Sequence, residues 1–224
     1  RNEHGQRKWR QKSQPAQAKK MKFVDLSHPV SNTIATYPTD PEVSIIREKE
    51  IDTDNTLLHS FKMGTHTGTH LDVPAHVIPG GKTVDSFPLS SFTGTAVKVN
   101  KTNLNSMDQI EDEIDGVIYE TGWYRHFNDA KVFYGSDRPQ IPEKLIEKIL
   151  ELKIFFFGCD LPSVDASGSK EKPVHNALLE LDIIIYESLT NLDQLPLLKP
   201  FEYFGFPLPF EKLDGSPVRA VGII

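Results

Sequence analysis

The feature of this sequence that most constrains its fold is the segment from His66 to His76, which reads HTGTHLDVPAH. It holds three of the eight histidines of the chain and one aspartate, and His66, His70, Asp72 and His76 all have even numbers. Side chains alternate between the two faces of an extended chain, so these four would project from the same face. Imidazole nitrogen and carboxylate oxygen are ligands of zinc and similar divalent ions. The segment therefore predicts a metal centre.

The backbone of this segment must bend for the four side chains to meet. Positions four apart in a flat strand are about 13 Å apart, whereas the ligand atoms of one ion lie within about 4 Å of each other. A helix would bring His66 and His70 together, but the intervening Thr-Gly-Thr and the following Pro74 disfavour a helix. We therefore expect a strand that curls at Gly68, which lacks a Cβ, and a change of direction at Pro74 that turns His76. The alternative is a polar loop with hydrogen-bonded histidines, and four ligand-type residues of one parity argue against it.

Length and composition are those of an ordinary folded protein. The 224 residues, 38% hydrophobic and 25% charged, suit one domain with a sizeable core, or at most two small ones. The net charge of −6 is uneven: residues 1–22 contain eight Lys or Arg and one Glu, a charge of +7, which leaves −13 for the rest. An acidic body argues against a nucleic-acid surface. Residues 1–22 show no hydrophobic periodicity, and we interpret them as a flexible basic N-terminal extension or a cloning remnant.

The chain has a single cysteine, Cys159, which excludes an internal disulfide. This is compatible with a reducing compartment, and a cytoplasmic location is expected. Cys159 is interpreted as a buried thiol without a role. No apolar run approaches the length of a membrane span, and the N-terminus lacks the apolar core of a secretory signal, so no interaction with a membrane is expected.

Strand-like segments outnumber helical ones along the chain. Strands are expected at residues 22–30, near 43–48 and 57–63, and at 94–99, 116–119, 154–157, 183–186 and 218–224. Helices are expected at 142–153, where apolar residues follow a proline at helical spacing, and at 174–181. No internal repeat or linker marks a second domain. The pattern predicts a single domain of mixed α/β class with a strand-rich core.

Two residues far downstream are candidates to complete the metal centre. Glu187 follows the apolar run 183–186, and a carboxylate at the end of a buried strand is costly unless it is paired or binds a cation. His175 lies in the first turn of the second expected helix. Each of them, taken alone, could equally be an exposed surface residue.

The segment 66–76 resembles the HxGTHxDxPxH signature of the cyclase family of metal-dependent hydrolases, which includes bacterial kynurenine formamidases and isatin hydrolase. The resemblance extends over nearly all of residues 23–224, an expected single hydrolase domain. Further matching stretches are 25–27, 37–38, 121–123, 158–160, 163–165, 173–179 and 187–192. The resemblance implies a β/β/α sandwich of the swivelling-domain type that assembles as a homodimer or a larger homo-oligomer.

The resemblance also implies a role for each site residue. The metal ligands it implies are His66, His70, Asp72, His175 and Glu187. The positions of Asp72 and Glu187 bridge two ions in the formamidases, and that of His76 is the general acid/base. Imidazole can accept a proton from water and return it to a leaving nitrogen near neutral pH. The expected cofactor is one or two divalent ions, zinc first and manganese second.

The predicted function is metal-dependent hydrolysis of a non-peptide C–N bond in a small aryl formamide or cyclic amide. Tyr37 stands where the formamidases carry a tryptophan that stacks on the substrate, so we expect Tyr37 to contact the substrate, with Phe87 as a weaker candidate. One alternative is hydrolysis of lactones or other cyclic compounds at the same site. Another is a non-catalytic metal-binding protein, against which an extra unliganded His76 argues.

Overall fold

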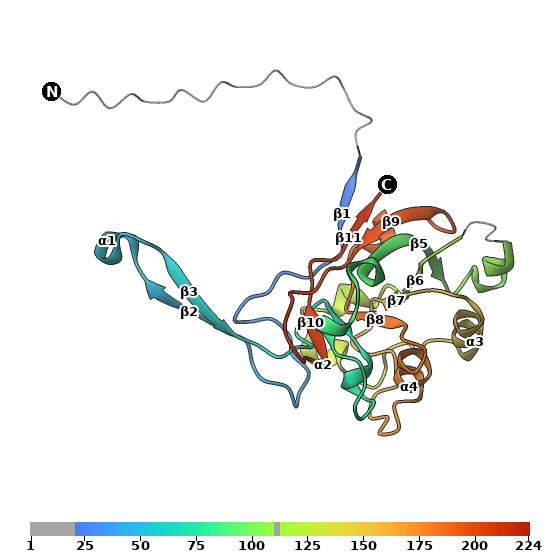
Figure 1. Ribbon diagram of the computed structural model, residues 1–224, viewed down its shortest axis with the longest axis horizontal. Coiled ribbons are helices and arrows are strands. Elements are labelled where there is room, and N and C mark those ends of the chain that lie inside the picture. The colour runs from blue at the N-terminus through green and yellow to red at the C-terminus, as the bar shows by residue number, and fades with distance from the viewer. Residues whose placement is uncertain (1–20, 110–112) are drawn as a thin grey trace, which may run out of the picture.

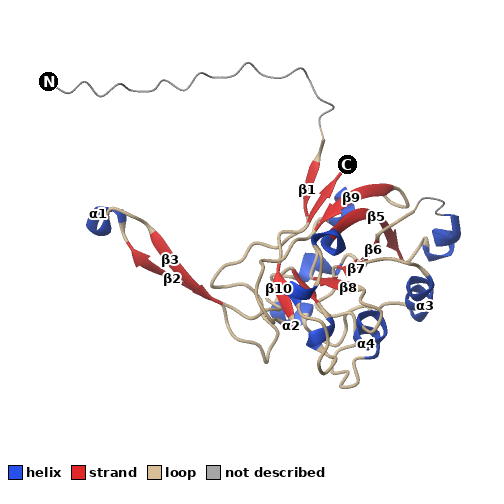
Figure 2. Ribbon diagram, viewed as in Figure 1, coloured by secondary structure: helices blue, strands red, loops and turns tan. Residues whose placement is uncertain are grey.

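The structure, a computed structural model, describes residues 21–109 and 113–224 (Figure 1). The basic extension expected at residues 1–22 lies almost wholly outside the described residues. Within them the chain forms a nine-stranded sheet and a separate two-stranded hairpin (Figure 2). The strands are β1 (Phe23–Asp25), β2 (Ser44–Lys49), β3 (Leu58–Lys62), β4 (His70–Asp72), β5 (Thr93–Asn100), β6 (Gly116–Glu120), β7 (Phe156–Cys159), β8 (Ile184–Glu187), β9 (Pro200–Phe204), β10 (Gly215–Pro217) and β11 (Val221–Ile223). The α-helices are α1 (Ile51–Asp54), α2 (Ala130–Phe133), α3 (Glu143–Glu151) and α4 (Pro173–Leu179).

The large sheet is parallel at its centre and antiparallel at both margins. Its order is β1-β11-β9-β5-β6-β7-β8-β4-β10, and β5 to β8 run parallel to one another. One margin is formed by the antiparallel strands β9, β11 and β1, and the other by β4 and β10. Parallel strands covered on both faces consist of near-continuous apolar runs, which is the composition of β6, β7 and β8.

Two apolar cores cover the two faces of this sheet. Successive side chains of a strand point to opposite faces, so Phe156 of β7 packs in one core with Tyr186 of β8. The next residue, Phe157, packs in the other core, where Leu145 of α3 and Leu178 of α4 also lie. The helices α3 and α4 therefore cover one face of the sheet. Polar side chains on this face near α4 are buried between the sheet and the helix.

The predicted class, a strand-rich mixed α/β fold in one domain, is confirmed. Helices α3 and α4 occupy the two ranges expected to be helical, with slightly shorter bounds. The first strand is also shorter than expected and ends at Asp25. Beyond Leu26, the Ser27 hydroxyl accepts a hydrogen bond from the backbone N–H of Ala220 at 2.7 Å, and this side-chain contact replaces regular backbone pairing.

Strands β9 and β10 were not expected from the sequence. The three residues of β10 are Gly-Ser-Pro, and glycine and proline are depleted in strands. The segment is extended because it pairs with β4, where Gly215 lies opposite Asp72 and Pro217 opposite His70. Tertiary pairing thus overrides the local preference of these residues.

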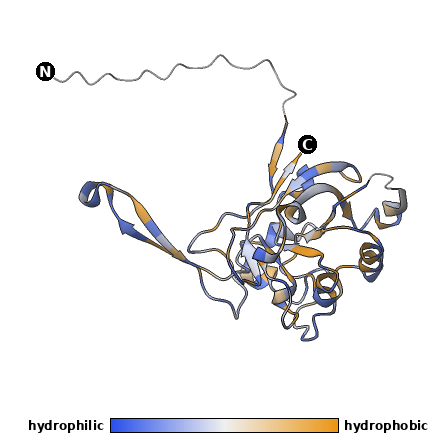
Figure 3. Cartoon of the chain, in the orientation of Figure 1, coloured by the Kyte–Doolittle hydropathy of each residue, from blue (hydrophilic) through white to orange (hydrophobic). Residues whose placement is uncertain are grey.

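Strands β2 and β3, with α1 at the tip between them, form an arm of residues 44–62 that extends away from the body of the protein (Figure 1). Every residue of β3 is exposed, and Phe61 is 62% exposed. Figure 3 shows apolar residues on this arm as well as on the strands of the body. The arm begins and ends next to the segment 66–76.

Over the described residues, no helix combines the length and the apolarity that crossing a bilayer requires.

Candidate metal centre

Three of the predicted ligands lie on one face of the sheet at its β4–β8 margin. His70 and Asp72 are two residues apart on β4, so their side chains share a face, and Leu71 between them packs into the opposite core. The antiparallel pairing of β4 with β8 places Glu187 opposite His70. All three side chains are buried, with exposed fractions of 1 to 3%. Strand register therefore brings together residues that are distant in the sequence.

The segment before β4 curls as the sequence indicated. Gly68 has a φ of +63°, in the left-handed region that glycine tolerates. The backbone carbonyl of Gly68 accepts a hydrogen bond from His70 Nδ1 at 2.9 Å, which leaves His70 Nε2 free on the other side of the ring. The curl also returns His66 toward β4, where its Nδ1 lies 2.6 Å from Asp72 Oδ1.

The last of the predicted ligands, His175, lies on α4. Its Nδ1 donates to Asp165 Oδ2 at 2.6 Å, and Asp165 also accepts from the backbone N–H groups of Val174 and His175. This carboxylate fixes the orientation of the imidazole, a common arrangement for metal-binding histidines. His175 Nε2 then lies 3.3 Å from Asp72 Oδ2 and 3.4 Å from Glu187 Oε1.

The donor atoms of His70, His175, Asp72 and Glu187 have the spacing and chemistry that a divalent ion needs, whereas the His66 nitrogens form short hydrogen bonds to Asp72 and Asp214. His70 Nε2 lies 3.4 Å from Asp72 Oδ1 and 3.5 Å from Glu187 Oε2. Atoms held roughly 2.0–2.2 Å from one tetrahedral ion are about 3.4 Å apart, longer than good hydrogen bonds. Asp72 Oδ2 is buried without a hydrogen-bond partner. Within the described residues, two sets of three side chains that share Asp72 have ligand atoms within 4.8 Å: His66, His70 and Asp72, and Asp72, His76 and His175.

Without a bound ion, the negative charge of these buried carboxylates must be balanced by protons on the neighbouring imidazoles. Burial alone would lower the pKa of His66 and His70, but the charge of Asp72 and contacts with carboxylates raise them to about 9 and about 10. Burial and the charge of Asp72 would raise the pKa of Glu187, but contacts with His175 and His70 lower it to about 2. Protonated imidazoles thus supply the positive charge that a divalent cation would supply, so the donor set fits such an ion.

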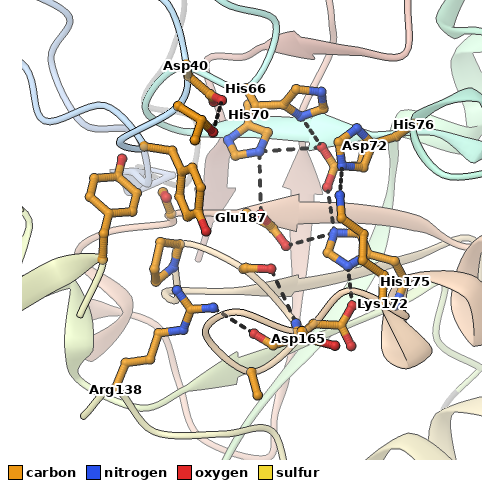
Figure 4. A pocket seen from close by; sticks show the side chains of 18 of the residues that line it. Asp40, His66, His70, Asp72, His76, Arg138, Asp165, Lys172, His175 and Glu187 are labelled. Atoms are coloured by element: carbon orange, nitrogen blue, oxygen red, sulfur yellow. Dashed lines mark hydrogen bonds and ion pairs between the residues drawn. The ribbon is translucent and has the colours of Figure 1, made fainter. Parts of the chain in front are cut away.

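A cavity of about 310 Å³ opens over these side chains (Figure 4). This volume suits a small molecule. The five predicted ligands, His76 and Tyr37 all line it. Tyr37 comes from the loop that leads into the arm, and its ring packs edge-on against Tyr134 with centroids 5.6 Å apart. Arg138, also in the lining, donates from Nη2 to the backbone carbonyl of Asp165 at 2.7 Å and so supports the loop that holds His175.

Phe87, the second expected substrate contact, is not brought to this cavity. It packs against the core that contains Phe156 and Tyr186. Its ring centroid lies 6.3 Å from that of Phe92, and Lys82 Nζ lies over the ring, 5.7 Å from its centroid. The apolar side chain at this position contributes to packing, because its segment lies beside η3 (Leu89–Phe92) and is not part of the lining of the cavity over the predicted metal ligands. Cys159 is buried, and burial raises the pKa of its thiol.

Two residues of the site were missed by reasoning from the sequence. Asp214 Oδ2 lies 2.8 Å from His66 Nε2 and 3.3 Å from His76 Nδ1, and these hydrogen bonds hold the pKa of Asp214 well below its usual range. Lys172 Nζ lies 3.0 Å from His76 Nε2. No spacing rule relates either residue to the segment 66–76, and only the β10–β4 pairing and the position of α4 bring them near it.

The family model and the relatives that match this chain are consistent with one another. A family model described as "putative cyclase" matches residues 24–166. A kynurenine formamidase of Salinibacter ruber is 33% identical over 210 residues, covering 90% of this chain and 97% of the relative. One of Bacillus anthracis is 31% identical over 211 residues, covering 91% of this chain and 98% of the relative.

Solved structures share the fold. An isatin hydrolase bound to the product analogue thioisatinate superimposes with a TM-score of 0.80 at 24% identity, covering 91% of this chain and 92% of that chain. A protein described as a potential metal-dependent hydrolase with cyclase activity has a TM-score of 0.73 at 21% identity, covering 91% of this chain and 98% of that chain.

Proposed function

Because this chain belongs to the cyclase family of metal-dependent hydrolases, we propose that it hydrolyses the C–N bond of a small aryl formamide or cyclic amide. The broader activity, metal-dependent hydrolysis of small amides, is common to the kynurenine formamidases that it resembles over nine-tenths of its length. The observation that carries the proposal is the convergence of three imidazoles on the buried carboxylates of Asp72 and Glu187, beneath a cavity of small-molecule size.

The ligands of the ion or ions would be His66, His70, Asp72, His175 and Glu187. Asp72 faces His70 with one carboxylate oxygen and His175 with the other, and Glu187 does the same, so both carboxylates would help to hold an ion beside either imidazole. Imidazole and carboxylate ligands suit zinc first and manganese second. A bound divalent ion would polarise the substrate carbonyl and make attack by water possible near neutral pH.

His76 would move the proton in this reaction. Its ring lies beside the ligand set, with its centroid 4.1 Å from that of His66, and it lines the cavity. From there the imidazole can accept a proton from the attacking water and return it to the leaving nitrogen. Tyr37 would stack on the substrate ring, since it lines the cavity and its hydroxyl tolerates a partly wet position.

The proposed function is tested by a substrate panel. The purified protein would be loaded with Zn²⁺ or Mn²⁺ and assayed with N-formylated aryl amines, isatin-like lactams and aryl lactones. Cleavage of a formamide or lactam at least tenfold faster than of lactones supports the proposal, and preferential lactone cleavage replaces it with the alternative reaction. A metal-loaded protein that cleaves none of the three classes would instead be a non-catalytic metal-binding protein.

We further propose that the arm binds a second copy of this chain. A two-stranded hairpin is at best marginally stable alone in water, and this one carries exposed Ile46, Ile51, Leu58 and Phe61. The body presents exposed apolar residues of its own in the segment 206–210. A standard interface uses roughly 20–30 residues on each side, and residues 44–62 of each partner reach the lower end of that range. In a twofold dimer each arm would pack on the body of the other copy.

A further inference from the structure

His76 is held at both ring nitrogens by residues that lie outside the segment 66–76. Lys172 Nζ is 3.0 Å from Nε2, and Asp214 Oδ2 is 3.3 Å from Nδ1 (Figure 4 shows His76 and Lys172). An ammonium group has donors and no acceptor, so Nε2 must accept from Lys172. In a neutral imidazole the hydrogen then sits on Nδ1, from which it donates to Asp214. The partners of the ring thus define its tautomer.

Asp214 is anchored to the strand that carries the metal ligands. Its backbone carbonyl accepts from Val73 N–H at 3.2 Å, and the next residue, Gly215, pairs with Asp72. A Cβ at Gly215 would lie 2.6 Å from the backbone oxygen of Leu71 and 2.8 Å from the His66 ring. Only glycine therefore permits the close approach that brings the Asp214 carboxylate to His66 and His76.

We propose that Asp214 is the positioning residue of the general base: it fixes His76 as the Nδ1–H tautomer, so that the Nε2 lone pair faces the cavity. The Nε2 lone pair can serve one partner at a time, so the attacking water, and afterwards the leaving nitrogen, would exchange a proton with Nε2 only in place of Lys172 Nζ. The inference rests on the proposed hydrolysis, in which His76 transfers protons. It adds two residues to the reaction that the family signature does not contain.

The proton balance requires this tautomer. The oxygen of water forms a bond to the amide carbon while one water proton passes to Nε2, which makes an imidazolium. The second hydrogen stays on Nδ1 and donates to Asp214, whose negative charge stabilises the imidazolium. The Nε2 proton then passes to the amide nitrogen as the C–N bond breaks, giving an amine and a carboxylic acid. In the opposite tautomer Nε2 already carries a hydrogen and cannot accept another.

The test compares Asp214→Ala with the wild-type protein and with Asp182→Asn. Asp182 is an exposed aspartate that pairs with Lys82, so its substitution is a control for removing a carboxylate elsewhere. ¹⁵N-histidine NMR of the metal-free protein, with the His76 signals assigned by their loss in His76→Gln, reports the tautomer without any turnover. We expect the Nδ1–H form to dominate in the wild-type, Asp182→Asn and Lys172→Met proteins. A mixture of both tautomers is expected when Asp214→Ala is combined with Lys172→Met, because Lys172 donates to Nε2 and by itself also favours the Nδ1–H form.

With saturating metal, Asp214→Ala should lower kcat roughly 10- to 100-fold, less than the roughly 10²–10⁴-fold contribution of the general base that it positions, and should change KM less than threefold. Asp214 also contacts His66, so metal content must be measured on the same samples. An activity loss that excess metal fully restores, or a His76 tautomer that stays Nδ1–H in the Lys172→Met/Asp214→Ala double variant, would overturn the proposal.

The variant Lys172→Met distinguishes the contributions of Lys172 and Asp214, the two hydrogen-bond partners of the His76 ring. Asp214 alone should maintain the Nδ1–H tautomer in this variant, whereas loss of that tautomer in Lys172→Met but not in Asp214→Ala would assign the positioning role to Lys172. If the wild-type protein cleaves no amide while the tautomer depends on Asp214, the proposed function fails and the structural role of Asp214 remains.

Discussion

Glu187 lies directly opposite His70 in the antiparallel pairing of β8 with β4, and its two carboxylate oxygens face two different imidazoles. Oε2 faces His70 and Oε1 faces His175, while Oε1 also accepts the backbone N–H of Val164 at 2.7 Å. One carboxylate therefore connects β4, β8 and α4 at the point where an ion would be held.

Replacing this carboxylate by an amide should remove metal and leave the fold. Glu187→Gln keeps an oxygen that can accept from Val164 N–H but loses the negative charge that bridges the two imidazoles. We expect metal affinity to fall at least 100-fold and the urea midpoint of the metal-free protein to decrease, because the lowered pKa of Glu187 means that its charge stabilises the folded state. The affinity is measured by competition with a chromophoric chelator. Glu202→Gln, an exposed change on β9, should bind metal normally, and tight binding by Glu187→Gln would contradict the ligand assignment.

His76→Ala should separate metal binding from catalysis. If His76 transfers protons and does not hold the ion, the variant retains its metal while kcat falls roughly 10²–10⁴-fold, the contribution of a general acid/base. Metal analysis and kcat are measured on one preparation. The ring nitrogens of His76 also lie within reach of Asp72 and His175, so a variant that loses stoichiometric metal would identify His76 as a ligand.

Removing the metal should destabilise the protein, because the ion binds the folded donor set and not the unfolded chain. An ion at 100 times its dissociation constant contributes about 2.7 kcal/mol, which for a domain of this size corresponds to a Tm change of roughly 5–10 °C. Differential scanning calorimetry before and after dialysis against a chelator measures this decrease. Adding Zn²⁺ back should restore the Tm, whereas adding Mg²⁺ should not, since the imidazole ligands suit Mg²⁺ poorly. An unchanged Tm would show that no ion is held.

The stability of the protein should fall between pH 6.5 and pH 4 because of His28. Its ring stacks on Phe127 with centroids 3.5 Å apart, and burial lowers its pKa from 6.5 to about 4. Below pH 6.5 the unfolded chain binds a proton that the folded protein does not, so unfolding becomes easier as the pH falls. The full shift corresponds to roughly 3 kcal/mol, and partial exposure of the ring reduces this to about 1–2 kcal/mol.

His28→Phe retains the stacking and removes the titration, so its stability should depend less on pH over this range. Urea unfolding of both proteins at pH 7, 5.5 and 4.5 measures the difference, in which the contributions of all other groups cancel. Equal losses of stability in the two proteins would exclude His28 as the cause.

Charged substitutions on the arm should dissociate the proposed dimer. Phe61→Asp combined with Leu58→Asp places two carboxylates on the exposed strand β3 and should convert a dimer into a monomer in sedimentation velocity, with little change in Tm. Leu181→Asp, at an exposed leucine outside the arm, is the matched control and should remain dimeric. A wild-type protein that sediments as a monomer at micromolar concentration would refute the proposed role of the arm.

Features that depend on neighbouring residues could be predicted from the sequence. The parity of His70 and Asp72, the glycine at 68 and the apolar runs of β6 to β8 follow from side-chain alternation, glycine conformation and burial, all of which act between residues close together in the chain. The helix α3 is determined in the same way by its apolar spacing. The match to the cyclase signature also needed only the sequence.

The distant residues that complete the site could be identified only from the folded chain. The β8–β4 register places Glu187 opposite His70, the packing of α4 aims His175 at Asp72, and the pairing of Gly-Ser-Pro with β4 brings Asp214 to His76. The folded chain also showed that Phe87 packs on the core and that residues 44–62 form a projecting arm. Strand register and helix placement are set by the sum of contacts over the whole chain, so no local pattern encodes them.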